Sequence, residues 1–519
     1  MQHALAHTRS ADFAAWYQDV IAEADLAEES GVRGCMIIRP WGYGIWQRMQ
    51  GLLDAKFRDS GHENCYFPLF IPLSFIAREA EHVEGFAKEM AVVTHHRLKV
   101  IDGVLQPDPE AQLEEPLIVR PTSETVIGAA FSRWVRSHRD LPLLLNQWAN
   151  VVRWEMRPRL FLRTAEFLWQ EGHTAHATAE DARTETARML EIYRGFAEGP
   201  LAMPVAAGEK PEHERFPGAD NTYSIEAMMQ DGKALQAGTA HYLGTNFARA
   251  QNIRYQNDAG ELAFCHTTSW GVSTRLVGGV VMTHGDDDGL RLPPIIAPRQ
   301  VVLIPMLRDK PEDAAVLEYC DALARELGAQ QACGEPVRAL VDRRAGRAID
   351  KRWAWIKRGV PVVCDIGARD AAAGNVTLIR RDRLRAADRI RSESLPRGQF
   401  VQSLPAMLAD IQSSLHAAAE AFLRANIRED IGSFEALAEH YREQPGETDE
   451  AGDAHSVRGW ALVPWSRPTG AALEAMEQQL KGLKLTVRNA PLGQAPVAGR
   501  RCIFSGAPAQ ELVLVGRAY

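Results

Sequence analysis

The sequence predicts an α/β protein: an antiparallel sheet with flanking helices, then a small α/β domain, then an α+β C-terminal domain. Residues 117–290 alternate short apolar runs with charged positions, as the strands of an antiparallel sheet do. Residues 301–366 alternate apolar strand-like runs with helical segments, which is typical of a small α/β domain. Residues 440–519 are rich in Gly, Pro and Trp and end in a strand-like run before Tyr519.

The elements follow from the spacing of apolar residues. Helices are expected at 11–30, after the break at Pro40, at 122–138 and at 179–198, and a proline-ended strand is expected at 67–72. In the second region, strands are expected at 301–307, 337–341 and 361–366, and helices at 311–327 and 346–358. Pro293-Pro294 and Pro298 mark a linker. We therefore expect three domains, residues 1–296, 297–400 and 401–519.

Composition excludes several classes of protein. The chain has 519 residues, of which 46% are hydrophobic and 24% charged, which is typical of a soluble globular protein and not of a disordered one. No apolar run approaches the ~18–20 residues that cross a bilayer, and no secretory signal is visible, so we expect a cytoplasmic protein without a membrane partner. Seven scattered cysteines without a CxxC pair indicate neither a disulfide framework nor a zinc ribbon.

Charge is distributed unevenly along the chain. The net charge is −8, yet residues 298–400 carry 20 basic against 14 acidic side chains. A basic segment in an acidic protein is a candidate docking surface for a phosphate backbone. A solvated helix face explains the same pattern equally well.

The residues that say most about the chemistry of a binding site are arginines on strand-like segments. Arg153 and Glu155 share one face of a strand by period two, and Arg163 follows after a turn. A guanidinium fork suits a phosphate or a carboxylate, although for this segment alone a set of surface salt bridges is the preferred explanation. A second cluster, residues 271–275, ends a Gly-bounded strand with Arg275. Arginines and paired acidic residues are what an ATP site without a Walker loop needs, and no GxxxxGK[ST] occurs.

These segments, taken in their order along the chain, resemble the motifs of class II aminoacyl-tRNA synthetases, and specifically those of the prolyl-tRNA synthetases of the archaeal–eukaryotic type. Pro40 lies where the dimer-forming first motif has its proline, 153–173 resembles the second motif, 273–275 resembles the third, and 120–124 and 236–247 resemble the proline-type signatures. The resemblance covers essentially the whole chain. It implies a class II antiparallel sheet, an anticodon-binding second domain and a homodimer. It also implies an ATP-dependent, AMP-forming ligase of protein biosynthesis, which activates L-proline to prolyl-adenylate and transfers it to the proline tRNA.

The resemblance also implies the site residues. Proline would be held by Thr122, Glu124, Arg153, Trp169, Glu171, His173 and His241. ATP, with Mg²⁺, would be held by Arg153, Glu155, Arg163, Thr164, Gln236, Thr239, Ser273 and Arg275. Arg153, Glu155 and Arg275 would be the catalytic set, with Arg153 bridging the proline carboxylate and the α-phosphate, as a bidentate donor can.

The chain departs from the family pattern in its second and third domains. Ile356, Asp365 and Ala368 stand where the family carries Glu, Glu and Pro, so the reading of the proline anticodon stays open. The family's C-terminal domain often binds zinc through four cysteines, of which only Cys502 remains, with Asn489 and Ser505 at aligned positions. Because one thiol cannot make a tetrahedral site, we expect no zinc and no other metal held by the protein.

Three functions stay open at this point. A working prolyl-tRNA synthetase is preferred. A duplicated proline-activating paralogue with a resistance or non-translational role is kept open by Ile356 and Asp365. A non-catalytic tRNA-binding regulator is opposed by the intact Arg153, Gln236 and Arg275.

Overall fold

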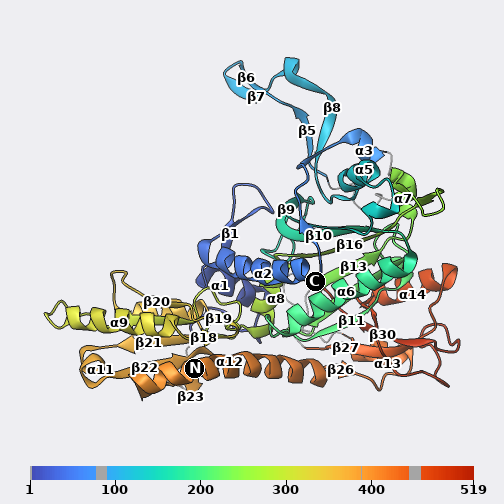
Figure 1. Cartoon of the computed structure of the whole chain (residues 1–519). Coiled ribbons are helices and arrows are strands. Elements are labelled where there is room, and N and C mark those ends of the chain that lie inside the picture. Colours follow the sequence, from blue (N-terminus) through green and yellow to red (C-terminus); the bar gives the residue numbers. More distant parts are fainter. Residues whose placement is uncertain (1–2, 78–89, 387–388, 443–456) are drawn as a thin grey trace.

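Three larger sheets organise the chain (Figure 1). The computed structural model describes residues 3–77, 90–386, 389–442 and 457–519. In the described ranges no helix is long and apolar enough to span a membrane.

The first sheet has eight strands in the order β29-β11-β12-β13-β16-β10-β9-β3. Neighbours are antiparallel except β3 and β9, which are parallel. Its strands are β3 (Glu63–Asn64), β9 (Leu143–Val152), β10 (Glu166–His176), β11 (Val205–Glu209), β12 (Asn221–Met228), β13 (Ala234–Tyr242), β16 (His266–Ser273) and β29 (Ala490–Pro491). This confirms the antiparallel sheet that the sequence predicts.

Helices cover one face of the first sheet and form the largest apolar core with it. They are α1 (Phe13–Glu23), α2 (Pro40–Asp59), α6 (Ala179–Glu198) and α8 (Arg275–His284). The helix α6 begins where Thr178 accepts a hydrogen bond from the Asp181 N–H, an N-cap that satisfies one free donor of the first turn. On β10, Gln170 points to this face, since its Oε1 accepts a hydrogen bond from Tyr193 of α6 at 2.5 Å. Alternate residues of β10 therefore point to the opposite, open face.

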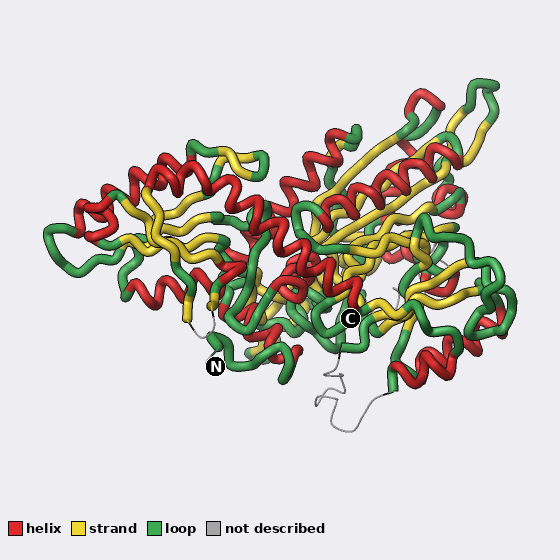
Figure 2. Tube along the Cα trace, turned by 90° about the horizontal axis from the view of Figure 1, so that it is seen from below, coloured by secondary structure: helices red, strands yellow, loops and turns green. Residues whose placement is uncertain are grey.

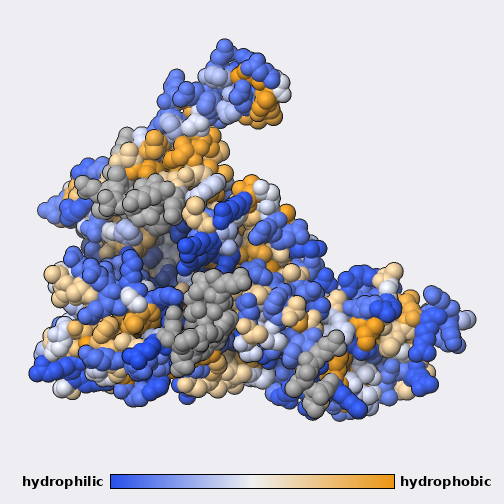
Figure 3. All heavy atoms as spheres, turned by 180° about the vertical axis from the view of Figure 1, so that it is seen from behind, coloured by the Kyte–Doolittle hydropathy of each residue, from blue (hydrophilic) through white to orange (hydrophobic). Residues whose placement is uncertain are grey.

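Smaller elements complete this part of the chain. They are β1 (Ala27–Glu29), β2 (Met36–Ile38), β4 (Phe70–Pro72), α3 (Leu73–Ala77), β5 (Val92–His95), β6 (Leu98–Ile101), β7 (Val104–Pro107), β8 (Gln112–Val119), α5 (Glu124–Trp134), α7 (Asn246–Gln251), β14 (Arg254–Gln256) and β15 (Leu262–Phe264). The hairpin β6–β7 projects from the body (Figure 1) and carries apolar side chains at its tip (Figure 3), among them the exposed Val100 and Leu105.

The second sheet has the order β20-β17-β21-β22-β25, with β17 parallel to β20 and β21. The elements of this region are β17 (Val301–Pro305), α9 (Asp313–Gly328), β18 (Gln331–Ala332), β19 (Glu335–Pro336), β20 (Ala339–Val341), α10 (Ala348–Lys357), β21 (Val362–Ile366), α11 (Ala368–Ala373), β22 (Asn375–Arg380), β23 (Arg385–Ala386), β24 (Arg389–Ile390), β25 (Glu393–Pro396) and α12 (Arg397–Ala425). The pairs β18–β19 and β23–β24 form separate two-stranded sheets. Phe400 and Leu404 of α12 belong to its core. The expected boundary at residue 400 thus falls inside α12, which runs on toward the third sheet (Figures 1 and 2).

The third sheet has the order β26-β27-β30-β28. Its elements are β26 (Ile427–Arg428), α13 (Phe434–His440), β27 (Trp460–Trp465), α14 (Gly470–Gly482), β28 (Thr486–Val487) and β30 (Glu511–Gly516). The strand β29 leaves this sheet and pairs with β11, with Gly208 opposite Pro491. The C-terminal segment (residues 426–519) therefore supplies an edge strand of the first sheet.

Candidate active site

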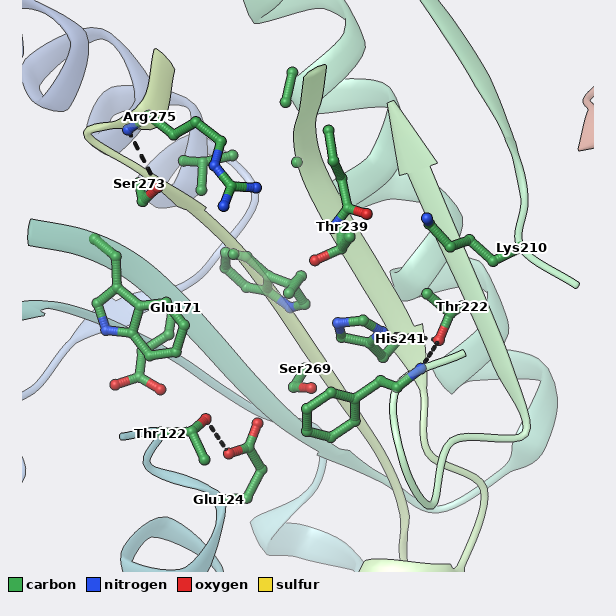
Figure 4. A pocket seen from close by; sticks show the side chains of 18 of the residues that line it. Thr122, Glu124, Glu171, Lys210, Thr222, Thr239, His241, Ser269, Ser273 and Arg275 are labelled. Atoms are coloured by element: carbon green, nitrogen blue, oxygen red, sulfur yellow. Dashed lines mark hydrogen bonds between the residues drawn. The ribbon is translucent and has the colours of Figure 1, made fainter. Parts of the chain in front are cut away.

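A cavity of about 250 Å³ lies on the open face of the first sheet (Figure 4). Side chains of β10, β12, β13 and β16 line it, together with the starts of α5 and α8 and the loop that follows β11. It brings together these residues expected from the sequence: Thr122, Glu124, Arg153, Trp169, Glu171, His173, Gln236, Thr239, His241, Ser273 and Arg275. Segments more than 150 residues apart in the sequence thus meet in one cavity.

Three expected residues do not line this cavity. Glu155 follows the end of β9, where its Oε1 accepts a hydrogen bond from the Arg157 N–H at 2.7 Å. Arg163 is exposed, and the next residue, Thr164, is buried. The charge of Arg163 nevertheless contributes, after burial and Arg153, to lowering the pKa of Arg275 to about 10. Arg163 therefore lies at the margin of the site.

The two carboxylates of the cavity differ in how fully they are satisfied. The Oε1 of Glu171 accepts hydrogen bonds from Ser123 Oγ at 2.5 Å and Gln147 Nε2 at 2.8 Å, and its Oε2 lies 2.9 Å from His173 Nε2. Glu124 is the first residue of α5 and accepts a hydrogen bond from the Thr122 hydroxyl. A helix N-terminus stabilises a carboxylate. Glu124 is thus better placed than Glu171 to accept a hydrogen bond from a ligand.

Charges fix the protonation of the Glu171–His173 pair. Burial raises the pKa of Glu171, but the hydrogen bonds from His173, Ser123 and Gln147 outweigh it and the pKa is lowered. Burial lowers the pKa of His173, but Glu171 outweighs it and the pKa is raised above its ordinary value. The pair is therefore held as a carboxylate and an imidazolium.

His241 is held neutral. Burial, followed by the charges of His173 and Lys210, lowers its pKa to about 3. Its Nδ1 lies 3.0 Å from the Thr222 hydroxyl, and its ring is 4.8 Å from the ring of Phe216. A neutral imidazole beside an aromatic ring suits a small apolar ligand ring.

Two of the cationic side chains that line the cavity, Arg153 and Arg275, were expected from the sequence. Arg153 donates from Nε to Pro121 O at 2.9 Å, and its guanidinium lies 5.3 Å from the ring of Trp169. Arg275, at the start of α8, donates from Nε to Leu162 O at 3.2 Å. Burial and then Arg153 lower the pKa of Arg275. Two cations that line one cavity favour the binding of an anion between them.

A β-bulge explains how β13 presents its polar residues. The register against β12 shifts between Ile225, opposite Gly238, and Glu226, opposite Gln236, so Ala237 is the extra residue. Because side chains alternate along a strand, Gln236 and Thr239, three positions apart, would otherwise point to opposite faces. Both line the cavity.

Sequence reasoning missed several lining residues. They are Phe167, Lys210, Glu214, Arg215, Phe216, Thr222 and Ser269. Most belong to residues 208–220, a charged stretch with Gly and Pro and no apolar period. The cluster of two basic residues and an aromatic in this stretch is the signal that was available.

Family models match two parts of the chain. "tRNA synthetase class II core domain (G, H, P, S and T)" matches residues 108–284, and "Anticodon binding domain" matches residues 300–406. A proline–tRNA ligase of Sphingomonas elodea is 62% identical over 100% of both chains, and one of Protochlamydia amoebophila is 51% identical over 99% of this chain and 98% of its own.

The chain belongs to the proline–tRNA ligase family. The crystal structure of prolyl-tRNA synthetase from Cryptosporidium parvum, complexed with halofuginone and AMPPNP, is 31% identical and superimposes with a TM-score of 0.86, over 99% of this chain and 97% of its own. The expected family, fold class and enzyme class, an ATP-dependent class II aminoacyl-tRNA synthetase, are thereby confirmed.

The three departures from the family pattern in the second domain lie in different surroundings. Ile356 is fully buried against Ile379 and Leu384, so its side chain belongs to the core. Asp365 lies 2.5 Å from Arg352, and burial raises its pKa although Arg352 opposes this. Ala368 is the first residue of α11.

Some of the basic side chains of residues 298–400 form ion pairs with acidic residues of the first part of the chain. Lys357 pairs with Glu23 at 2.6 Å, Arg358 with Asp25 at 2.8 Å, and Arg385 with Asp288 at 2.6 Å. These pairs join the second sheet to the helices and loops around the first. Charge in this segment is therefore not all available to a nucleic acid.

Cys502 lies in a cluster of hydroxyl groups. Burial raises the pKa of its thiol, but hydrogen bonds with Ser466, Ser505 and the Phe504 backbone outweigh it and the pKa is lowered. Ser466 Oγ lies 2.9 Å from Ser505 Oγ. Asn489 instead donates to Ser224 Oγ at 3.2 Å, in the first sheet. In the described ranges no group of three His, Cys, Asp or Glu side chains is placed to hold a metal, and the absence of zinc stays a prediction.

Proposed function

We propose that this cavity forms prolyl-adenylate from L-proline and ATP, and that the chain then transfers the prolyl group to the proline tRNA. One observation carries the proposal: Arg153 and Arg275 line the same cavity as Glu124. Cations suit the carboxylate and phosphates, and the carboxylate of Glu124 suits the protonated imino group.

In the proposed reaction, a carboxylate oxygen of proline attacks the α-phosphorus of ATP and pyrophosphate leaves. Arg153 would contact both the carboxylate and the α-phosphate, and Arg275 the remaining phosphates. Thr122 and Glu124 would hold the imino group, with Trp169, His173 and His241 around the ring. Because both reactants are substrates, positioning and charge neutralisation suffice and no protein nucleophile is needed.

The residues around ATP carry different support. Gln236, Thr239 and Ser273 line the cavity and are proposed to contact ATP. Glu155, Arg163 and Thr164 stay predictions from the resemblance. Mg²⁺ is proposed to enter with the nucleotide, since phosphate oxygens with one or two carboxylates are its usual ligands in such sites. The Glu214 carboxylate lines the cavity.

Three further features belong to this proposal: a division into three domains with the second extended to the end of α12, a cytoplasmic location, and a homodimer. Val32, Ile37 and Tyr43 are exposed apolar side chains around Pro40. Such a group is typical of a surface that another chain covers. Sedimentation at micromolar concentration should show a dimer, and a monomer would contradict that part of the proposal.

The direct test has two stages. Proline-dependent exchange of pyrophosphate into ATP measures activation, and charging of the proline tRNA measures transfer. Both should occur. Exchange without charging would indicate a proline-activating paralogue, and absence of both would indicate a tRNA-binding regulator.

A further inference from the structure

A buried series of charges connects the C-terminal segment to the cavity. Lys210, which follows β11, lines the cavity with a side chain only 3% exposed. Its Nζ lies 3.6 Å from Oε1 of Glu226, a fully buried residue of β12. Arg488 of the C-terminal segment donates from Nε and Nη2 to Glu226 Oε2, at 3.2 and 2.8 Å. Arg488 and Glu226 are 262 residues apart in the sequence.

The fold fixes Arg488 in this position. Its Nη1 donates to Thr486 Oγ1 at 2.9 Å. The next residue, Asn489, donates to Ser224 Oγ at 3.2 Å and to Ala206 O at 3.0 Å. The strand β29 then pairs with β11. The guanidinium is thus held from both sides against the first sheet.

This arrangement limits how strongly Glu226 binds Lys210. Arg488 occupies Oε2, and Ser224 Oγ donates to Oε1 at 2.9 Å. The 3.6 Å between Lys210 and Glu226 exceeds ordinary hydrogen-bond length. The ammonium is therefore balanced by two carboxylates beyond hydrogen-bond length, Glu226 and, at 3.7 Å, Glu214, and keeps hydrogen-bond donors for a ligand in the cavity.

The register of the first sheet places the ammonium toward the proposed nucleotide half of the cavity, because Glu226, 3.6 Å from the ammonium, lies opposite Gln236 of β13, which is proposed to contact ATP. The charges of Glu226 and Arg488 also act on the pKa of Arg275, which is lowered first by burial. An anionic ligand group belongs in this half.

We infer that Lys210 binds phosphate oxygens of ATP, and that Arg488 is a positioning residue that keeps Lys210 available by holding Glu226. The inference rests on the proposed nucleotide half of the cavity. Without Arg488, Glu226 would turn to Lys210, the nearest remaining cation, and draw the ammonium out of the cavity.

The test measures KM for ATP and KM for proline by pyrophosphate exchange, on the full chain. Lys210→Met and Arg488→Met should each raise KM for ATP about tenfold or more, as expected for loss of one charge-assisted hydrogen bond. KM for proline should stay within about twofold, because the contact that is removed is made to ATP and not to proline. The double variant should match Lys210→Met alone, because Arg488 acts through Lys210. Arg467→Met is the matched control, because Arg467 also reaches the first sheet, at Glu209, but lies outside the cavity.

Three results would overturn the inference: a wild-type KM for ATP in Lys210→Met, an equal rise in KM for proline, or effects that multiply in the double variant. If Arg488→Met does not fold, Glu226→Gln/Arg488→Met removes both buried charges and should keep KM for ATP close to the wild-type value, because no carboxylate of residue 226 then draws Lys210 away; a rise equal to that of Lys210→Met would contradict the positioning role. Arg275→Ala reports separately on the nucleotide half. If it raises KM for ATP and Lys210→Met does not, the inference fails alone; if neither raises it, the nucleotide half itself is wrong.

Discussion

Arg275, which is half-buried, and Arg381, which is fully buried, lie in opposite surroundings. Arg381, next to β22, is 2% exposed and donates from both terminal nitrogens to Asp286, at 2.8 and 2.5 Å. Arg275 donates to a backbone carbonyl, and the charges that act on it first are the cations Arg153 and Arg163.

The difference shows how a stabilising arginine is distinguished from a ligand-binding one. Asp286 compensates Arg381 within the chain, and burial of that carboxylate is outweighed by Arg381, which lowers the pKa of Asp286 to about 2. Around Arg275, cationic neighbours leave the compensation to an anionic ligand. The cavity is therefore expected to lose activity when an arginine is removed, and the Arg381 contact to lose stability.

The largest effect is expected from Arg153→Ala. This variant should lower proline-dependent pyrophosphate exchange more than about a hundredfold, because it removes a charge-assisted contact to the group that gains charge in the transition state, worth ~3–4 kcal/mol. Its free energy of unfolding should change much less. Near-normal exchange would remove Arg153 from the proposed reaction.

A stability effect is expected from Arg381→Met. Breaking this pair leaves Asp286 with only the more distant Arg291, at 3.8 Å, so the loss should approach the about 3–5 kcal/mol expected when a buried ion pair is broken. Denaturant unfolding measures the loss, and exchange per folded molecule should fall far less than in Arg153→Ala.

The exposed pair of Arg347 with Asp350 supplies the control for this measurement. Arg347→Met should leave the unfolding midpoint unchanged, since an exposed pair is screened by solvent. Equal loss in both variants would show that the border of the two sheets is not stabilised by Arg381.

The smallest effect is a pH dependence from His173. Its folded-state pKa is raised above the unfolded value of about 6.5. Its stabilising contribution is therefore complete below about pH 6.5 and is lost as the pH rises through the folded-state pKa. Unfolding of the wild type and of His173→Gln should be compared at pH 6 and pH 9. The stability difference between them should shrink at pH 9, whereas the effect of Arg381→Met should not, because arginine stays charged. A constant difference for His173→Gln would contradict the imidazolium assignment.

Much of the site could be predicted because short-range rules hold along single strands. Trp169, Glu171 and His173 alternate along β10, so period two places them together on one face. The motif order likewise indicated the family before any geometry. Period two failed at Arg153 and Glu155, because β9 ends at Val152 and the chain then turns.

The sequence by itself determined the family, the antiparallel sheet and about half of the residues that meet in the cavity, because motifs and strand periods are local. Only the tertiary structure decided that Ala237 bulges out of β13, that Glu155 lies outside the cavity, and that Arg488 reaches Glu226. Each of these depends on how separate segments dock, and contacts between residues far apart in the chain leave no period in the sequence from which they could be read.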